Sequence, residues 1–365
     1  MRRGTIFVVL FVVIALGVIA ASQFLRSQPP LEVTIAVSPL AEGWLRDAVN
    51  AFNATNPLVN TTRIQIKLTL IEDMKVWSED RPWTTADHPA AWIPASSASV
   101  GYAGDNGLPF QLVTPSLART PLVWGGFTSR LAVLDVPASG LDWAQVVAAA
   151  DAESWANLGG SSDWQFVKLA FARPSGQISG LAVLFSGAAT YHQSASLDNA
   201  MLRDTAFREW LAPVIASVPN FNTLGADPAA AMGRGPSTAE IAFLPEVQWL
   251  NNLNGLLTNT DSFAFSYPAY QFMLDFPLAR WDDNGTTAEQ RAAVDALRNW
   301  LTTESQQQRT VAFGLRPAAS EPDGGATLFS AAIPYGIQYQ PDYGQLIQAP
   351  QRGDAQGLIQ WFNTQ

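Results

Sequence analysis

Two serines four residues apart, Ser175 and Ser179, are the side chains of this sequence best placed to bind a polar ligand. They lie in the run 173–180, Arg-Pro-Ser-Gly-Gln-Ile-Ser-Gly, between the apolar stretches 166–171 and 181–184. This order predicts a strand, a tight turn and the first turn of a buried helix. The free N–H groups of a helix start attract anions and polar oxygens, and hydroxyls beside them can add to such a site. The alternative is that one serine only caps the helix, because serine is a favoured N-cap residue.

Hydroxyl side chains also follow strands in the first third of the chain. Apolar and β-branched runs predict strands at 31–37, 64–70, 90–97 and 117–124. Ser38 follows the first of these strands, and Ser96 and Ser97 end the third. Between the first two strands, apolar residues recur at helical spacing from Trp44 to Phe52. Strands that alternate with helices predict a mostly parallel sheet, and ligands bind at the carboxyl ends of such strands.

Composition limits the classes of function. The length of 365 residues predicts two lobes, and 48% hydrophobic with 14% charged residues predicts large folded cores. The net charge of −10 argues against a nucleic-acid partner, although a local group of N–H donors can still bind an anion. The chain has no cysteine and two histidines, so thiolate chemistry is excluded and histidine-based metal sites are poorly supplied. We therefore expect no metal and no cofactor.

The N-terminus carries an export signal. Arg2 and Arg3 precede an apolar segment, residues 6–25, whose stretch from 6 to 22 carries no charge. Its length lies at the lower edge of what spans a bilayer, so it is either a cleaved signal peptide or a retained membrane anchor. The two arginines keep the N-terminus cytoplasmic, which predicts that the chain from about residue 27 onward is extracytoplasmic, either secreted or anchored to the cell membrane.

Three collinear segments carry a family resemblance. Residues 33–52, the Trp-Ile-Pro-Ala-Ser-Ser run at 92–97 and residues 118–123 resemble bacterial extracellular solute-binding proteins with the type 2 periplasmic-binding fold. The branch is similar to molybdate and sulfate binders and to members that carry a von Willebrand factor A domain. The resemblance implies an α/β fold of two lobes, each a mostly parallel sheet flanked by helices, with two crossover strands as a hinge.

The same resemblance divides the chain. Residues 1–30 are the signal peptide or anchor with its linker, 31–122 plus 267–317 form lobe 1, and 123–266 form lobe 2. Residues 318–365 are a C-terminal tail packed on the lobes. The first crossing between the lobes is expected near 120–124, and the segments 262–268 and 272–277 are similar to the family's return crossing.

Two further candidate residues come from the resemblance. In relatives, the turn before the helix at Ser179 supplies hydroxyls and N–H groups to the ligand. Arg173 stands where many relatives have an aspartate, which favours a negative group on the ligand. Glu246 follows the predicted buried strand 239–244 and resembles a glutamate near the family's cleft. It either accepts ligand hydroxyl or amine groups or pairs across the hinge, and the sequence favours neither.

The leading hypothesis is a non-enzymatic extracytoplasmic protein that closes two lobes on a small polar or anionic solute. The expected partner is an ABC-type membrane permease, and the expected state is a monomer. The expected ligand-binding residues are Ser38, Ser96, Ser97, Arg173, Ser175, Ser179 and Glu246. One alternative is a membrane-anchored sensor or interaction module with the same fold. The other, a serine hydrolase, is disfavoured because these serines lack the Gly-x-Ser-x-Gly and Ser-x-x-Lys spacings.

Overall fold

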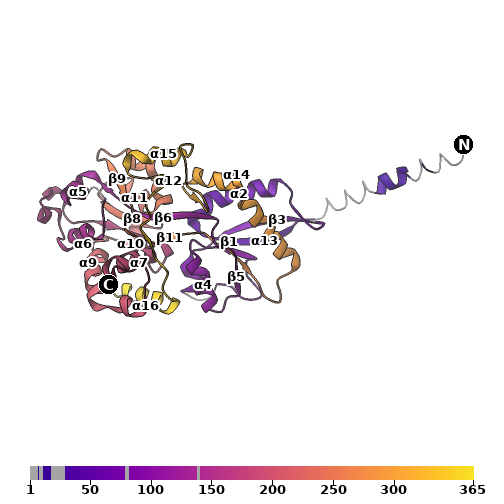
Figure 1. Cartoon of the computed structure of the whole chain (residues 1–365), viewed down its shortest axis with the longest axis horizontal. Helices are drawn as coiled ribbons and strands as arrows, with labels where there is room; N and C mark the ends of the chain where they lie inside the picture. The colour runs from indigo at the N-terminus through magenta and orange to yellow at the C-terminus, as the bar shows by residue number, and fades with distance from the viewer. Residues whose placement is uncertain (1–6, 8–10, 18–28, 79–81, 138–139) are drawn as a thin grey trace.

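The chain folds into two α/β lobes that lie side by side, as a computed structural model shows for residues 7, 11–17, 29–78, 82–137 and 140–365 (Figure 1). Each lobe is built on a six-stranded sheet. The first sheet contains β1 (Leu31–Val37), β2 (Leu58–Val59), β3 (Thr62–Leu70), β4 (Ala91–Ile93), β5 (Phe110–Thr114) and β12 (Leu278–Trp281). The second contains β6 (Ala118–Phe127), β7 (Leu169–Ala170), β8 (Ile241–Pro245), β9 (Phe263–Ser266), β11 (Met273–Leu274) and β13 (Arg316–Pro317).

Helices flank both sheets. Those of the first lobe are η1 (Pro39–Ala41), α2 (Glu42–Ala54), α3 (Asp73–Trp77), α4 (Ser97–Asp105), α13 (Ala288–Leu301), α14 (Glu304–Arg309) and η4 (Thr310–Phe313). Those of the second are α5 (Thr128–Val133), α6 (Trp143–Asp151), η2 (Trp155–Leu158), η3 (Ser162–Trp164), α7 (Ile178–His192), α8 (Asn199–Arg203), α9 (Thr205–Ala216), α10 (Phe221–Leu224), α11 (Pro228–Met232) and α12 (Glu246–Leu257). The predicted two-lobed α/β fold is confirmed.

Strand pairing is more mixed than the sequence indicates. In the first sheet, β1 pairs in parallel with both β3 and β4, whereas β12 runs antiparallel to β4 and β5. In the second sheet, β7 and β8 are parallel, but β6 is antiparallel to β8, β9, β11 and β13. The strands that carry the chain out of the first lobe and back run in opposite directions, which accounts for the antiparallel pairs of β11 with β6 and of β12 with β5. Sequence periodicity does not report strand direction.

The chain passes between the lobes on paired strands. β5 belongs to the first sheet, and the next strand, β6, belongs to the second. On the way back, β11 pairs with the start of β6 through Leu274 and Thr120, and β12 re-enters the first sheet. Our division of the chain at 122/123 and 266/267 stays a proposal.

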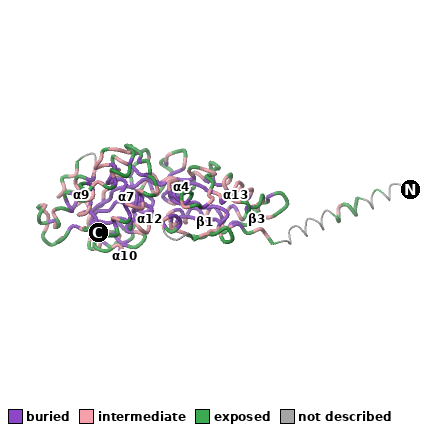
Figure 2. The backbone as a smooth tube through the Cα atoms, turned by 90° about the horizontal axis from the view of Figure 1, so that it is seen from below, coloured by how far each residue is buried: buried purple, intermediate pink, exposed green. Residues whose placement is uncertain are grey.

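Each lobe has its own buried centre, seen as purple stretches within both halves of the molecule (Figure 2). The apolar residues that predict the helix after the first strand, from Trp44 to Phe52, all lie on the buried face of α2. The helix predicted at 288–301 is α13, which begins with a capping box in which Thr287 and Gln290 bond each other's backbone. The predicted strand 166–171 is shorter, because only β7 pairs with a neighbour in the sheet.

The C-terminal segment crosses both lobes. It contains α15 (Thr327–Ala332), η5 (Ile333–Tyr335), β14 (Gln345–Leu346) and α16 (Arg352–Phe362), and β14 pairs with β10 (Tyr270–Gln271). Tyr102 of α4 donates a hydrogen bond to the Pro350 carbonyl at 2.6 Å, and Arg352 donates to the Trp77 carbonyl at 2.9 Å. On the other lobe, Phe362 packs on Phe221. The segment therefore joins elements of the first lobe to elements of the second.

The N-terminal segment 6–25 lies largely outside the described residues. Residues 11–17 are helical and point away from the two lobes (Figure 1). Their apolar side chains are largely exposed, as Phe11 at 73% and Leu16 at 60% illustrate. Within the described ranges, no helix combines the length and the apolar character needed to cross a bilayer.

Candidate ligand-binding site

A cavity of about 190 Å³ lies between the two lobes. Its wall from the first lobe is formed by the segments that follow β1 and β3, and its wall from the second lobe by segments around α7, α11 and α12. The lining residues are Pro39, Leu40, Glu72, Gln177, Ala226, Asp227, Val247, Gln248 and Asn251. Because residues on both sides come from the ends of strands and the starts of helices, the cavity lies where an α/β fold places its ligands.

A side-chain hydrogen bond bridges the cavity. Gln177 Nε2, from the second lobe, donates to Glu72 Oε1 of the first lobe at 3.1 Å and to the Ala226 carbonyl at 3.3 Å. Burial raises the pKa of the Glu72 carboxyl, and the hydrogen bond from Gln177 opposes that rise in part. The bond joins the two lobes, so they touch across the cavity in this structure, an arrangement we call the closed form.

The serine-containing motif positions Gln177 because the backbone of residues 172–173 lies directly against the start of α7. Gln177 is the N-cap residue of α7, and its backbone N–H donates to the Arg173 carbonyl at 2.9 Å, which folds the turn back on itself. At Gly180, a Cβ atom would lie 2.1 Å from the Ala172 carbonyl oxygen, so only glycine lets residues 172–173 lie against the helix. The predicted strand, turn and helix are therefore present, and the N-cap residue lies two residues from each serine.

The serines of this motif do not line the cavity. Ser175 is half-buried in the turn and Ser179 is buried in the first turn of α7, and neither caps the helix with its side chain. Ser38 is buried at the end of β1, where its backbone N–H donates to the Ile93 carbonyl. Each is close in sequence to a lining residue, since Pro39 follows Ser38 and Gln177 lies between the two other serines. Their role as ligand contacts stays a prediction.

The chain's own carboxylates occupy the helix start at Ser96 and Ser97. Asp73, which is fully buried, accepts hydrogen bonds from the N–H groups of Ala95 at 3.0 Å and Ser96 at 3.3 Å, and from the Ser99 hydroxyl at 2.7 Å. Asp275 accepts from the Ser97 N–H at 2.7 Å. Burial raises the pKa of Asp73 to about 7 and raises that of Asp275 as well. The predicted strand 90–97 is therefore shorter, since α4 begins at Ser97, and the N-terminus of this helix already binds two internal acids.

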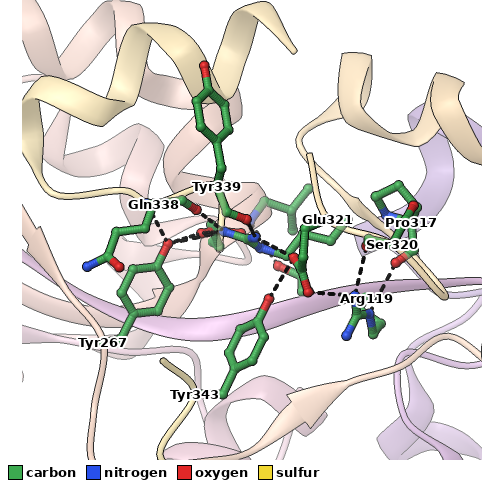
Figure 3. A network of polar contacts seen from close by, with 12 residues as sticks. Arg119, Tyr267, Pro317, Ser320, Glu321, Gln338, Tyr339 and Tyr343 are labelled. Carbon is green, nitrogen blue, oxygen red and sulfur yellow. Dashed lines mark hydrogen bonds and ion pairs between the residues drawn. The ribbon is translucent and has the colours of Figure 1, made fainter. Parts of the chain in front are cut away.

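Glu246 forms a buried ion pair with an arginine of the second sheet. It is fully buried at the start of α12, where Arg316 of β13 donates to its two carboxylate oxygens at 2.6 and 2.8 Å and Tyr267 donates at 2.5 Å. The other Arg316 N–H groups bond Glu321 and the carbonyls of Gln338 and Tyr339. Figure 3 shows this network, with Arg119 binding the same Glu321. The Glu246 carboxylate is thus engaged by Arg316 and Tyr267, and its two predicted roles, ligand contact or pairing across the hinge, stay a prediction.

Arg173 lies on the outer surface of the second lobe. Its guanidinium stands 5.3 Å from the centre of the Phe221 ring. It lines an open groove of about 770 Å³ together with Glu209, Phe362 and Gln365. This groove is larger than the interlobe cavity, but the helices and C-terminal residues that line it all belong to or pack on one lobe. Lobe closure would not bury a ligand there, so we place the candidate site in the smaller cavity.

None of the residues that line the cavity was among the candidates from the sequence; its polar and acidic lining residues are Glu72, Gln177, Asp227, Gln248 and Asn251. Glu72 comes two residues after β3, so the rule that selects Ser38 would have selected it too. Gln177 lies inside the serine motif, but an amide between two serines carries no sequence signal of its own. Gln248 lies on the first turn of α12, two residues after Glu246, and no sequence pattern shows that its side chain faces the cavity.

Both histidines lie away from this site. His88 Nδ1 is 3.0 Å from the Pro89 carbonyl oxygen and its ring stacks on Trp281, while His192 Nε2 is 3.0 Å from the Met201 carbonyl oxygen. The described ranges contain no group of three or more histidine, cysteine or acidic side chains able to hold a metal ion.

Comparisons with known proteins show likeness in fold. No protein-family model and no curated protein sequence matches this chain. Among solved structures, iron-bound HitA from Pseudomonas aeruginosa is similar with a TM-score of 0.59 and 13% identity, over 92% of this chain and 99% of that one. Periplasmic binding protein AfuA from Actinobacillus pleuropneumoniae, with fructose-6-phosphate bound, has a TM-score of 0.57 and 11% identity, over 91% and 98%.

The sulfate-binding protein SubI from Mycobacterium tuberculosis is similar with a TM-score of 0.54 and 12% identity, over 89% of this chain and 96% of that chain. At such low identity, the similarity does not identify a ligand for this chain. It also does not assign the chain to a branch of these proteins, and the von Willebrand branch is not shown. The chain has the two-lobed α/β fold of periplasmic binding proteins.

Proposed function

We propose that this chain is an extracytoplasmic solute-binding protein that closes its two lobes on a small polar ligand and delivers it to an ABC-type permease. The observation that carries the proposal is the interlobe cavity, whose walls come from both lobes and are joined by the hydrogen bond from Gln177 to Glu72. A ligand that contacts both walls would favour the same arrangement of the lobes, and this couples its binding to closure.

The proposal includes an extracytoplasmic location and no catalytic activity. Two arginines before an uncharged apolar stretch support export, and the exposed apolar side chains of residues 11–17 support contact with a membrane, as signal or anchor. The N-terminus of the chain from membrane and secreted fractions, read by mass spectrometry, separates cleavage from anchoring. A full-length chain found only in the cytosol would contradict both. Neither histidine lines the cavity, which supports a binding role over histidine-assisted hydrolysis.

Lobe closure can be measured directly because the chain has no cysteine of its own. Ala206 of α9 and Ala288 of α13 are exposed and lie on different lobes, so the A206C/A288C variant can carry two spin labels. Without ligand, we expect a distribution that includes distances longer than the closed form allows. A ligand should shift the distribution to the short distance. If the distance between the two labels stays the same with every solute tested, closure of the lobes on a ligand is refuted.

A second function, a membrane-anchored sensor or interaction module with the same fold, is favoured by one observation. The C-terminal segment joins the lobes through Tyr102 to Pro350 and Arg352 to Trp77 on one side and through Phe362 on the other. A strap of this kind opposes wide opening, which a transport cycle needs. If cells that lack this chain no longer take up the solute that it binds, transport is favoured. If the lobes close on the solute but its uptake does not depend on the chain, the sensor or interaction module is favoured.

A further inference from the structure

Among the residues that line the interlobe cavity, the buried side-chain atoms without a hydrogen-bond partner in the described chain are acceptors. Gln248 is only 6% exposed, and its Nε2 donates to the Ala226 carbonyl at 2.9 Å. Gln177 Nε2 likewise donates to the Ala226 carbonyl and to Glu72 Oε1. In the described chain, the Oε1 atoms of both glutamines are buried without a hydrogen-bond partner. Because an unpaired buried acceptor is costly, these two oxygens are expected to meet donors on a ligand.

The charges around the cavity have one sign. Of the residues that line it, Glu72 and Asp227 are acidic and none is basic. Lys75, exposed on α3, is the nearby cation, and its effect on the pKa of Glu72 is smaller than that of burial. Asp73 and Asp275 fill the start of α4, which does not line the cavity. An anion entering this cavity would therefore meet two lining carboxylates, and the cation nearby, Lys75, is not part of the lining.

We infer that the cavity takes a small organic cation, an amine whose N–H groups donate to the Glu72 carboxylate and to the free carbonyl oxygens of Gln177 and Gln248. An ammonium group has three donors and no acceptor, so it matches an acceptor-lined wall, whereas each hydroxyl of a sugar brings lone pairs that need donors. The volume of about 190 Å³ equals roughly six water molecules, which limits the ligand to a compact one. The inference rests on the proposed solute-binding function.

A bare metal cation fits the site less well than an amine. Hard divalent cations take six or more oxygen ligands, with carboxylates prominent among them. Two acidic residues line the cavity, and Asp227 already accepts from the Ala230 N–H and from Asn252. Glu72 is then the one lining carboxylate with an oxygen not engaged by a described neighbour.

The test compares amines with uncharged molecules of the same shape. The full-length chain in mild detergent is titrated with ethanolamine and putrescine, with their diol analogues ethylene glycol and butanediol, and with sulfate and phosphate, at constant ionic strength. We expect the two amines to raise the midpoint of thermal unfolding with concentration, and the diols and oxyanions to leave it unchanged. Calorimetry then gives the affinity for the amine.

Variants assign the binding to this cavity. Glu72→Gln keeps the shape and an acceptor for Gln177 but removes the charge, so amine affinity should fall about tenfold or more. Gln248→Met removes the free oxygen and should weaken amine binding while the protein stays folded. Glu209→Gln is the matched control, since it makes the same change in the outer groove and should leave the affinity unchanged.

Each outcome decides between the two proposals. Stabilisation by sulfate, phosphate or a diol without stabilisation by amines would overturn the cation inference and leave solute binding intact. Amine binding that is lost in Glu209→Gln and kept in Glu72→Gln would place the ligand in the outer groove and overturn the inference too. If no amine binds but the A206C/A288C distances still show opening and closure, only the ligand class is wrong. If the A206C/A288C distance is the same under all conditions and no solute binds, both the cation inference and the proposed solute-binding function are refuted.

Discussion

Replacing Arg316 by methionine should destabilise this protein more than any surface charge change, because it leaves Glu246 buried without its counter-charge. Arg316 and Glu246 are both fully buried, and two of the guanidinium N–H groups bond the carboxylate. The remaining N–H groups bond Glu321 and the carbonyls of Gln338 and Tyr339, so all of the guanidinium nitrogens donate. Methionine keeps the apolar stem of the arginine and removes every one of these donors.

The size of the effect follows from that burial. Removing one partner of a buried ion pair typically costs about 3–5 kcal/mol, because the other charge stays desolvated. Neutralising the partner as well, in Arg316→Met with Glu246→Gln, should recover a large share of this loss, since Tyr267 can still donate to the glutamine oxygen. Arg309→Met is the control: Arg309 pairs with Asp47 on the surface and is half exposed, which predicts a loss of about 0–1 kcal/mol.

The assay is urea unfolding of the four proteins, followed by far-ultraviolet circular dichroism at neutral pH. The free energy of unfolding should fall for Arg316→Met by several times the change seen for Arg309→Met. Limited proteolysis should cut within 318–343 sooner in the variant, because Arg316 holds three residues of that segment. Equal stability of Arg316→Met and Arg309→Met would refute the view that this network holds the hinge and the tail.

Three further predictions follow from the lobes and their contacts. Burial raises the pKa of Asp73 from 3.8 to about 7, so the folded state holds its proton more tightly, and the stability this proton adds is lost as pH rises through about 7. The unfolding free energy should therefore be larger at pH 5 than at pH 7, with about 2 kcal/mol of the difference due to Asp73. If the unfolding free energy of Asp73→Asn depends on pH just as steeply, Asp73 is not the cause of this dependence. Gly180→Ala should cost about 1–3 kcal/mol in urea unfolding, because its Cβ would meet the Ala172 carbonyl oxygen at 2.1 Å, whereas Gly176→Ala, with 3.7 Å to the nearest atom, should be tolerated. Tyr102→Phe removes the hydrogen bond to Pro350 and should lower stability by about 1 kcal/mol while widening the A206C/A288C distances, and unchanged distances would show that the C-terminal segment does not restrain the lobes.

The sequence predicts the elements with strong local signals well. The alternating run at 31–37 is β1, and the helix at 288–301 is α13, because a capping box and an apolar stripe mark its start and its face. The apolar run 166–171 forms only the short β7, since Phe166 is exposed outside the sheet. A run of apolar residues does not tell which of them find a partner strand.

The sequence predicts segments that lie beside the cavity but none of the residues that line it. The serine motif and the end of β1 do lie at the interlobe cavity, as the rule for strand ends and helix starts indicates. The side chains that line it are Gln177 and Glu72 rather than the serines beside them, because side-chain direction depends on how the turn folds over α7. Arg173 was expected near the ligand, but the backbone turn directs it to Phe221 on the outer surface.

The most direct test of the account is the A206C/A288C distance during a titration with ethanolamine. For the otherwise unchanged protein, the account predicts that longer distances disappear as the amine is added and that the short distance of the closed form grows. In Glu72→Gln, the same amine concentrations should leave the distribution unshifted. A distribution that ignores the amine in both proteins, or shifts equally in both, would contradict closure of the lobes on a cation held by Glu72.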